Sequence, residues 1–311
     1  MQIAGEVRKL GRSDEAEAVY TTAMQLDPTS FVARFRLIET MVPAQRHEEA
    51  APIVEQTQSL GPRAWRVAIQ AARYKRWLGR PDEAIQILQS HLGIQEDADI
   101  RAQLQAEIAN LYLHLNDYQT ASEMLNATDD SEQNFRLTLA RVRLALAQGR
   151  YEDVETLGHE WRRTGAEGIR FLAPYEMAIG HDDHARELFE EIPSELGLMP
   201  AAAVSMAHLY LKVDDADTAA ALLEKSRQAF TLQLEDKYTA GGAYYSLASI
   251  SAIEGETDEA LNLLEKAIAS GWTGHSFAPR NPNLESLWEE PRFQALITGV
   301  KAEMDRLRLA M

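Results

Sequence analysis

The chain has 311 residues, of which 45% are hydrophobic and 25% are charged, and its net charge is −17 at pH 7. This excess of acid argues against a general nucleic-acid binder, which needs clustered Lys and Arg, and against a surface drawn to anionic lipid. Cysteine is absent, which excludes disulfides, thiolate metal sites and thiol nucleophiles.

Apolar runs are short. The longest, such as Ala201 to Met206, fall far below the roughly 20 residues that a membrane span needs. The opening residues, Met1 to Glu6, lack the basic and then apolar character of a signal peptide. We therefore expect a cytoplasmic location, and a periplasmic one stays open if the chain belongs to a membrane-anchored protein.

A small residue recurs along the chain at intervals of 31 to 41 residues. We call these positions the anchors: Ala16, Ala50, Ala84, Ala121, Val154, Ala185, Ala219 and Ala260. Five residues before them stand Gly11, Gln45, Gly79, Asn116, Gly149, Gly180, Asp214 and Gly255. All but Gln45 are typical turn residues. The pattern predicts a turn followed by a helix at every copy.

The first copy shows the pattern in detail. Ser13 is placed to cap a helix, Ala16, Tyr20 and Ala23 share one helix face, and Pro28 ends the helix. An alanine, an aromatic residue four later, an alanine three further on and a proline five further on resemble the second-helix signature of the tetratricopeptide repeat.

This resemblance implies an all-α fold, a right-handed α-solenoid of about eight helix–turn–helix units, because short helix pairs bury their apolar faces only when stacked. The units are residues 1–30 (partial), 31–64, 65–101, 102–134, 135–165, 166–199, 200–240 and 241–270. The first unit lacks most of its first helix, as would a domain excised from a longer protein. Within the units we expect helices at 31–42, 47–60, 65–78 and 81–92.

Two units depart from the pattern. In the fifth, Val154 replaces the anchor alanine, Gly158 replaces the aromatic residue, and Arg141 falls where an apolar residue is expected. After the seventh anchor the spacing is seven residues longer than usual. We therefore expect an extended second helix or linker around Ser226 to Glu235.

Residues 271–311 break the repeat. Pro291 is well placed as the first residue of a helix, and Phe293 and Ile297 begin an apolar stripe along it. We expect this segment to cap the last repeat. It also resembles the segment that closes repeat arrays in bacterial multidomain signalling proteins. That resemblance implies an accessory module at the C-terminal end of a larger bacterial regulatory protein.

In the tetratricopeptide repeat family the first helix of each pair lines the concave surface. The family's inward positions, read onto this chain, give a candidate partner-binding groove. Its residues are Arg66, Ile69, Arg73, Arg76, Asn110, Leu113, Arg136, Arg143, Arg170 and His208. Asn110 falls where carboxylate-binding members of the family place an asparagine, but the lysines of that clamp are absent.

Two of these first helices are basic. Trp65 to Leu78 contains four basic residues and no acid, and Phe135 to Gln148 contains three and no acid. A field of one sign in a low-dielectric cleft is focused, and arginine can hold a carboxylate through two hydrogen bonds. We therefore expect the groove to bind an acidic or extended peptide of a protein partner. The alternative is that these arginines pair with glutamates of neighbouring helices.

Signatures of catalysis and of cofactors are weak. His181 and His184 are the best metal candidates, but they lie in a predicted turn with no obvious third ligand. No glycine-rich phosphate loop occurs. We predict a non-catalytic binding protein without cofactor or metal. The rival from another class is an enzyme with its site around His159, His181 and His184.

Two further functions stay open. Trp272, Trp288 and Phe293 could form an exposed apolar patch through which the chain forms a homodimer or a larger homo-oligomer. The groove could instead close on a small anionic ligand, as in a sensor domain.

Overall fold

The computed structural model describes residues 13–41, 46–60, 65–78, 80–128, 135–162, 166–192, 199–235 and 240–311. Every regular element within these ranges is helical, so the expected all-α helical-repeat fold is confirmed. The turn residues Gly11, Gln45 and Gly79 lie outside the described residues. None of the described helices combines the length and the apolarity that a membrane crossing requires.

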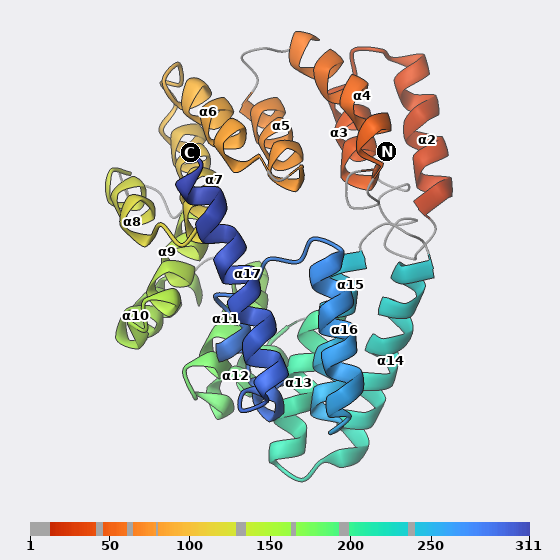
Figure 1. The fold of residues 1–311 in the computed structure, drawn as a ribbon, viewed down its shortest axis with the longest axis vertical. Coiled ribbons are helices and arrows are strands. Elements are labelled where there is room, and N and C mark those ends of the chain that lie inside the picture. The colour runs from red at the N-terminus through yellow and green to blue at the C-terminus, as the bar shows by residue number, and fades with distance from the viewer. Residues whose placement is uncertain are drawn as a thin grey trace.

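The helices follow one another in pairs along the chain (Figure 1). After α2 (Ser13–Leu26) the pairs are α3 (Phe31–Met41) with α4 (His47–Leu60), α5 (Trp65–Trp77) with α6 (Pro81–Leu92), α7 (Ala98–His114) with α8 (Tyr118–Asn126), α9 (Phe135–Ala147) with α10 (Tyr151–Arg162), α11 (Ala166–Ala178) with α12 (Asp182–Glu190), α13 (Pro200–Lys212) with α14 (Ala216–Glu235), and α15 (Ala240–Ile253) with α16 (Thr257–Ala269). The observed bounds of α4 and α6 are those expected from the sequence, and α14 is the extended helix of the seventh unit.

The turn inside each pair has one recurring geometry. The residue five before the anchor adopts a left-handed backbone wherever it is described, at Gly149, Gly180 and Gly255 and also at Asn116 (φ 57°) and Asp214 (φ 61°). The next residue then donates its amide to the carbonyl five residues back, as Arg150 does to Ala145 over 2.9 Å. This bond satisfies a carbonyl that the end of the first helix leaves without a partner. The same bond closes the turns before the anchors Ala50, Ala84, Ala121, Ala185, Ala219 and Ala260.

Every anchor is fully buried, with 0% of its surface exposed. A small side chain there lets the two helices of a pair approach closely, which is why alanine recurs. Val154 occupies the same buried position in the divergent fifth unit, so the repeat register is unbroken there. Buried apolar clusters succeed one another along the array, each shared by neighbouring pairs, as expected for a solenoid core that grows along one axis.

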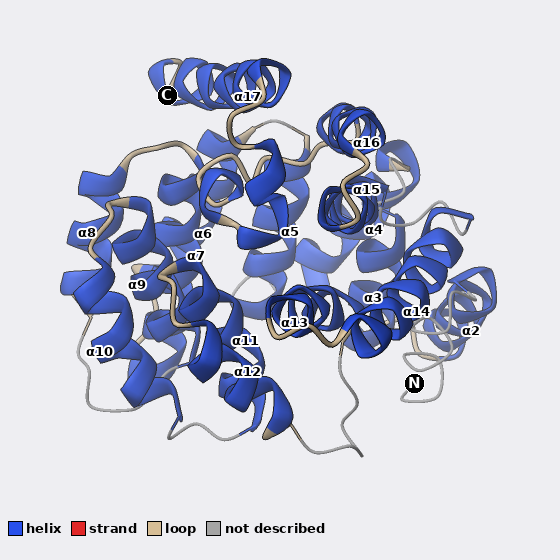
Figure 2. Ribbon diagram, turned by 90° about the horizontal axis from the view of Figure 1, so that it is seen from below, coloured by secondary structure: helices blue, strands red, loops and turns tan. Residues whose placement is uncertain are grey.

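The array follows a curved path. Both views place α2 to α4 on the same side of the molecule as α14 to α16, although these helices come from opposite ends of the described chain (Figures 1 and 2). The first helices α5, α7 and α9 pack directly on one another in sequence. These three helices therefore form a continuous wall, and the candidate groove lies along it.

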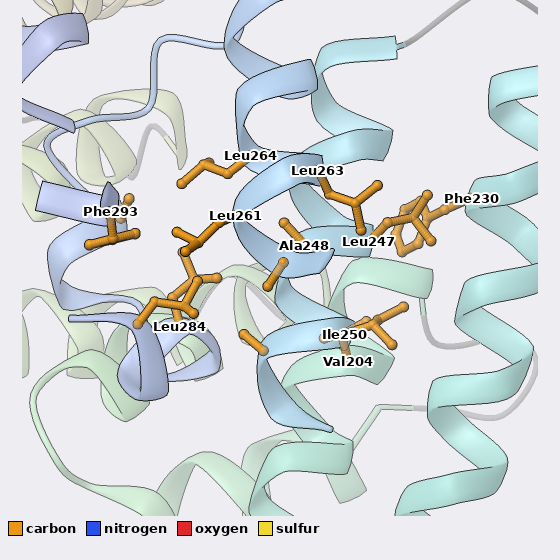
Figure 3. Close-up of a cluster of buried hydrophobic side chains, with 14 of the residues drawn as sticks. Val204, Phe230, Leu247, Ala248, Ile250, Leu261, Leu263, Leu264, Leu284 and Phe293 are labelled. Atoms are coloured by element: carbon orange, nitrogen blue, oxygen red, sulfur yellow. The ribbon is translucent and has the colours of Figure 1, made fainter. Parts of the chain in front are cut away.

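The C-terminal segment contains η1 (Ala278–Arg280), η2 (Pro282–Leu287) and α17 (Pro291–Leu309), and α17 begins at the expected Pro291. η2 packs on α13 and α15. Leu284 and Phe293 join the buried cluster formed by α13 to α16 (Figure 3). The exposed patch expected of Trp272, Trp288 and Phe293 does not form. Phe293 is 2% exposed, Trp272 stacks on Tyr245 with ring centroids 4.7 Å apart, and Trp288 packs on the same cluster.

The far end of α17 reaches back to the turn between α7 and α8. The side-chain nitrogen of Asn116 donates to Asp305 Oδ1 over 3.2 Å, and Arg308 donates to the backbone carbonyl of Asn116 over 3.1 Å. The Asn116 side-chain oxygen faces the His275 imidazole at 2.6 Å. Leu307 packs against the apolar cluster of α5 to α7. The C-terminal segment thus connects the last helix pair to the middle of the array.

Candidate ligand-binding groove

The wall formed by α5, α7 and α9 borders a cavity of about 580 Å³, which we call the cationic pocket. It is lined by Ile69, Ala72, Arg73, Arg76, Leu88, Ala106, Glu107, Asn110, Leu111, His114, Arg136, Leu139 and Arg143. Four guanidinium groups face one carboxylate in this lining, which leaves a surplus of three positive charges. The chain as a whole carries a charge of −17.

One carboxylate connects the two sides of the pocket. Oε1 of Glu107, on α7, accepts from Arg73 of α5 over 2.7 Å and from Arg136 of α9 over 2.8 Å. The Glu107 side chain is 18% exposed, whereas those of Arg73 and Arg136 are 33% and 45% exposed. The pairing of arginines with glutamates of neighbouring helices, which was the alternative to a binding role, therefore occurs at these two residues.

Arg143 is held by neutral groups. Its Nε donates to the Tyr175 hydroxyl and its Nη1 to the Asn110 side-chain oxygen, both over 3.2 Å. The Tyr175 oxygen is the main cause that raises the pKa of Arg143 above its usual value, and Glu107 adds to it. Tyr175 lies on α11 and packs edge-on against Phe277 of the C-terminal segment. These two contacts orient the Arg143 guanidinium, and neither of them involves a carboxylate.

The pocket is strongly electropositive around Arg76, His114 and Arg143. Burial lowers the pKa of Arg76, and repulsion from Arg73 and Arg143 lowers it further against the attraction of Glu107. Burial, together with Arg76, Arg143 and His275, lowers the pKa of His114 to about 3. His114 is therefore a neutral imidazole at physiological pH, enclosed between arginines of α5 and α9.

A second cavity, of about 560 Å³, adjoins the cationic pocket and shares Arg73 and Arg136 with it. Five of its ten lining residues are apolar or aromatic side chains of α3 and α5, among them Phe31, Phe35 and Trp65. Four others are arginines: Arg36, Arg66, Arg73 and Arg136. The Arg66 guanidinium lies over the Trp65 ring, 4.6 Å from its centroid. We call this cavity the aromatic pocket. Together the two cavities form a groove in which aromatic side chains gather at one end and arginines line both pockets.

Seven of the ten residues proposed for the groove line these two pockets, two lie elsewhere, and the side chain of one is not described. Those that do are Arg66, Ile69, Arg73, Arg76, Asn110, Arg136 and Arg143. Leu113 instead lies in the buried cluster of α7 to α9, because it packs toward α8. His208 is far along the array, and the side chain of Arg170 lies outside the described residues.

Sequence reasoning missed Glu107, His114 and Tyr175. Glu107 and His114 stand three residues before and four residues after Asn110, a spacing that places all three on one helix face. The spacing alone could therefore have predicted that Glu107 and His114 lie beside Asn110. The contact of Tyr175 with Arg143 crosses from α11 to α9, and no spacing within one helix predicts it.

His208 lies beneath the C-terminal segment. It is 7% exposed and borders a smaller cavity of about 240 Å³ between α13, α15 and η2. Asn283 of η2 donates to Ser205 over 2.9 Å, and Asn281 donates to the Tyr245 hydroxyl over 2.8 Å. The chain's own C-terminal segment therefore occupies this part of the inner surface, and the open groove lies along α3 to α9.

The two histidines of the sixth unit lie beside one buried carboxylate. Nδ1 of His181 and Nδ1 of His184 lie 2.9 and 3.4 Å from Oε2 of Glu176, which is 2% exposed. Among the described residues, no group of three or more His, Asp or Glu side chains is arranged to hold a metal ion. Gly158 packs against Glu176, and a Cβ there would lie 3.1 Å from the carboxylate. The side chain of His159 is outside the described part.

Comparison with known proteins identifies the repeat. The family model of the tetratricopeptide repeat matches residues 3–30 and 241–270. No curated protein matches the chain significantly in sequence. Among solved structures, the chain is similar to a Rap protein complexed with competence and sporulation factor. The identity is 15%, the match covers 99% of this chain and 98% of that chain, and the TM-score is 0.53.

Two other solved structures were matched. A signal transduction ATPase with a tetratricopeptide repeat sensor, from Pyrococcus horikoshii, is 12% identical, with 93% of this chain and 55% of that chain covered and a TM-score of 0.52. The human IFIT1 dimer with m7Gppp-AAAA is 15% identical over 84% of this chain and 68% of that chain, with a TM-score of 0.47. The tetratricopeptide repeat model matches near both ends of the chain, and the recurring helix pairs described between them have the fold of a tetratricopeptide repeat array.

Proposed function

We propose that this protein is a non-catalytic scaffold that binds an acidic, extended segment of a partner protein along the groove of α3 to α9. The observation that supports the proposal is the surplus of positive charge in the cationic pocket of a chain whose net charge is −17. The resemblance of residues 271–311 to the segment that closes repeat arrays in bacterial signalling proteins favours a scaffold that is the C-terminal module of a larger regulatory protein.

The charge distribution gives the groove selectivity. Acidic surface elsewhere repels an acidic partner segment, while a recessed cationic site focuses the field and attracts it. Guanidinium groups bind carboxylates in a fixed planar geometry, so the arginines also orient what they bind. Arg143 is already held by Asn110 and Tyr175, which reduces the conformational entropy lost when a ligand binds.

The shape of the groove suits an extended segment rather than a compact domain. The two pockets share Arg73 and Arg136, so one peptide would contact both. An acidic side chain would lie at Arg76 and Arg143, and a large apolar side chain would lie among Phe31, Phe35 and Trp65. A partner segment that combines acidic and apolar residues therefore fits better than a purely acidic one.

Charge reversal in the groove tests the proposal. The double variant Arg73→Glu/Arg143→Glu is expected to lose capture of partner proteins from a lysate, while the helical circular-dichroism signal stays unchanged. The matched control is Arg306→Glu, because the Arg306 side chain is 65% exposed on α17 and lies outside both pockets. If the groove variant captures the same partners as the unmodified protein, the arginines are ordinary surface charges and the proposal fails.

A further inference from the structure

The positive groups of the cationic pocket are arranged in two tiers. In the first, Arg73 and Arg136 approach each other from α5 and α9 and share the carboxylate of Glu107. In the second, Arg76 of α5 and Arg143 of α9 flank His114 of α7, and the charges of both arginines act on that imidazole. The first tier shows that one anion can bridge the two helices.

The second tier differs from the first in what surrounds it. Arg143 donates to the neutral side chains of Asn110 and Tyr175, and Glu107 is the one acid among the residues that line the pocket. Four arginines and one glutamate therefore leave the lining of the pocket with an excess of positive charge. A single carboxylate carries one negative charge and would leave most of the surplus uncompensated.

A phosphoryl group matches this tier better. It carries a charge of about −1.5 to −2 at neutral pH and presents three strong acceptor oxygens. A planar carboxylate directs two oxygens toward one guanidinium, whereas a tetrahedral phosphoryl group can accept from donors on several sides at once. Arg76, His114 and Arg143 belong to three different helices, so their donors reach the pocket from different sides.

We infer that the second tier binds the phosphoryl group of a phosphorylated segment of a partner protein, with Arg76 and Arg143 as the principal contacts. This inference rests on the proposed function, because it assigns the anchoring group of the same groove. The neighbouring aromatic pocket then receives an apolar residue of the same segment. The phosphoryl group, rather than acidity alone, makes the partner recognisable.

Three labelled peptides that differ at one place test the inference by fluorescence anisotropy at low ionic strength. They contain Glu-Glu-Phe-Ser-Glu-Glu, the same sequence with phosphoserine, and a version in which two glutamates replace the serine. We expect the phosphorylated peptide to bind about tenfold more tightly than the other two. The third peptide carries nearly the charge of the phosphorylated one, so it separates geometry from net charge.

Variants assign the effect to the second tier. Arg143→Gln should abolish the preference for the phosphorylated peptide, and Arg143→Lys should weaken it while keeping the charge. Arg306→Gln makes the same charge change on α17 and should leave the preference unchanged. Comparison of the three peptides on the unmodified protein does not depend on how well any variant folds.

The outcomes separate the inference from the proposed function. Equal binding of the three peptides would overturn the phosphoryl assignment and leave the acidic-segment proposal standing. Failure of all three to bind would count against both. Phenyl phosphate binding as tightly as the phosphorylated peptide would overturn a protein segment as the source of the phosphoryl group.

Discussion

The side-chain oxygen of Asn116 lies 2.6 Å from Nε2 of His275, although 159 residues separate the two in sequence. Asn116 combines two roles, because its backbone has the left-handed geometry of the repeat turn and its side chain binds the C-terminal segment. Glycine adopts the same backbone conformation without strain. The two roles can therefore be separated by mutation.

Asn116→Gly is expected to keep the turn and release the C-terminal segment. It removes the acceptor of a 4% exposed histidine, and an unsatisfied buried polar group costs about 1–3 kcal/mol of stability. Hydrogen exchange of residues 291–309 should become faster. Asp214→Gly is the matched control, because Asp214 has the same left-handed backbone and an exposed side chain. Equal exchange in the two variants would show that the contacts of Asn116 do not hold α17.

Acid should destabilise the protein through His114. Its pKa is about 3 in the folded protein, below the ordinary value of 6.5, so the unfolded chain takes up a proton that the folded chain does not. The stability from this group is complete above pH 6.5 and falls as the pH drops toward 3, by at most about 1.4 kcal/mol per pH unit.

Urea unfolding at pH 7.0 and pH 5.0 measures this effect. His114→Gln should reduce the loss of stability between the two pH values, and His91→Gln, in α6 outside the cationic pocket, should not. The same loss in His114→Gln and in the unmodified protein would contradict the placement of this imidazole between Arg76 and Arg143.

Glu107→Gln is expected to strengthen anion binding and weaken the fold. The change removes the one acid in the pocket lining, so affinity for an acidic peptide should rise by about tenfold at low salt. Arg73 and Arg136 lose the carboxylate that they share, which should lower stability by about 1 kcal/mol. Isothermal titration and thermal unfolding measure the two effects. Glu303→Gln, on exposed α17, is the control, and unchanged affinity in Glu107→Gln would exclude electrostatic attraction as the source of binding.

Gly158→Tyr restores the residue type of the repeat signature and is nevertheless expected to destabilise the protein. A Cβ at Gly158 would lie 3.0 Å from Leu172 and 3.1 Å from Glu176, so an aromatic ring has no space. Overpacking of a filled core typically costs about 1–3 kcal/mol. A lower midpoint of thermal unfolding is expected, and a midpoint that rises would show that Glu176 can move aside.

The helix pairs were predictable because their causes are local. Ala84 and Ala185 are small where two helices meet, and Gly149 and Gly180 permit the left-handed turn, so the spacing of these residues reports the geometry directly. The basic character of the groove was also local, because Arg73 and Arg76 lie on one short helix. The partner of Arg73 was not local, since the choice of Glu107 over other acids depends on how α5, α7 and α9 pack.

The path of the C-terminal segment could not be predicted in this way. Its contacts join residues such as Asn116 and Arg308, which are 192 positions apart, and no repeating pattern connects them. The alternative of an exposed patch at Trp272 and Phe293 stayed open in the sequence for the same reason. The aromatic partner Tyr245 and the cluster below it become neighbours of these residues only when the segment turns back.

A solenoid whose units touch only their neighbours can fray from either end, one repeat at a time. The hydrogen bond that the Asn116 side chain donates to Asp305, and the one that Arg308 donates to the Asn116 carbonyl, remove this freedom from the second half of the chain. Helices α8 to α16 lie within a loop closed by these bonds, so the last repeats cannot peel away singly. This half of the molecule should melt as one block, whereas the repeats before α7 keep the piecemeal melting of an open array.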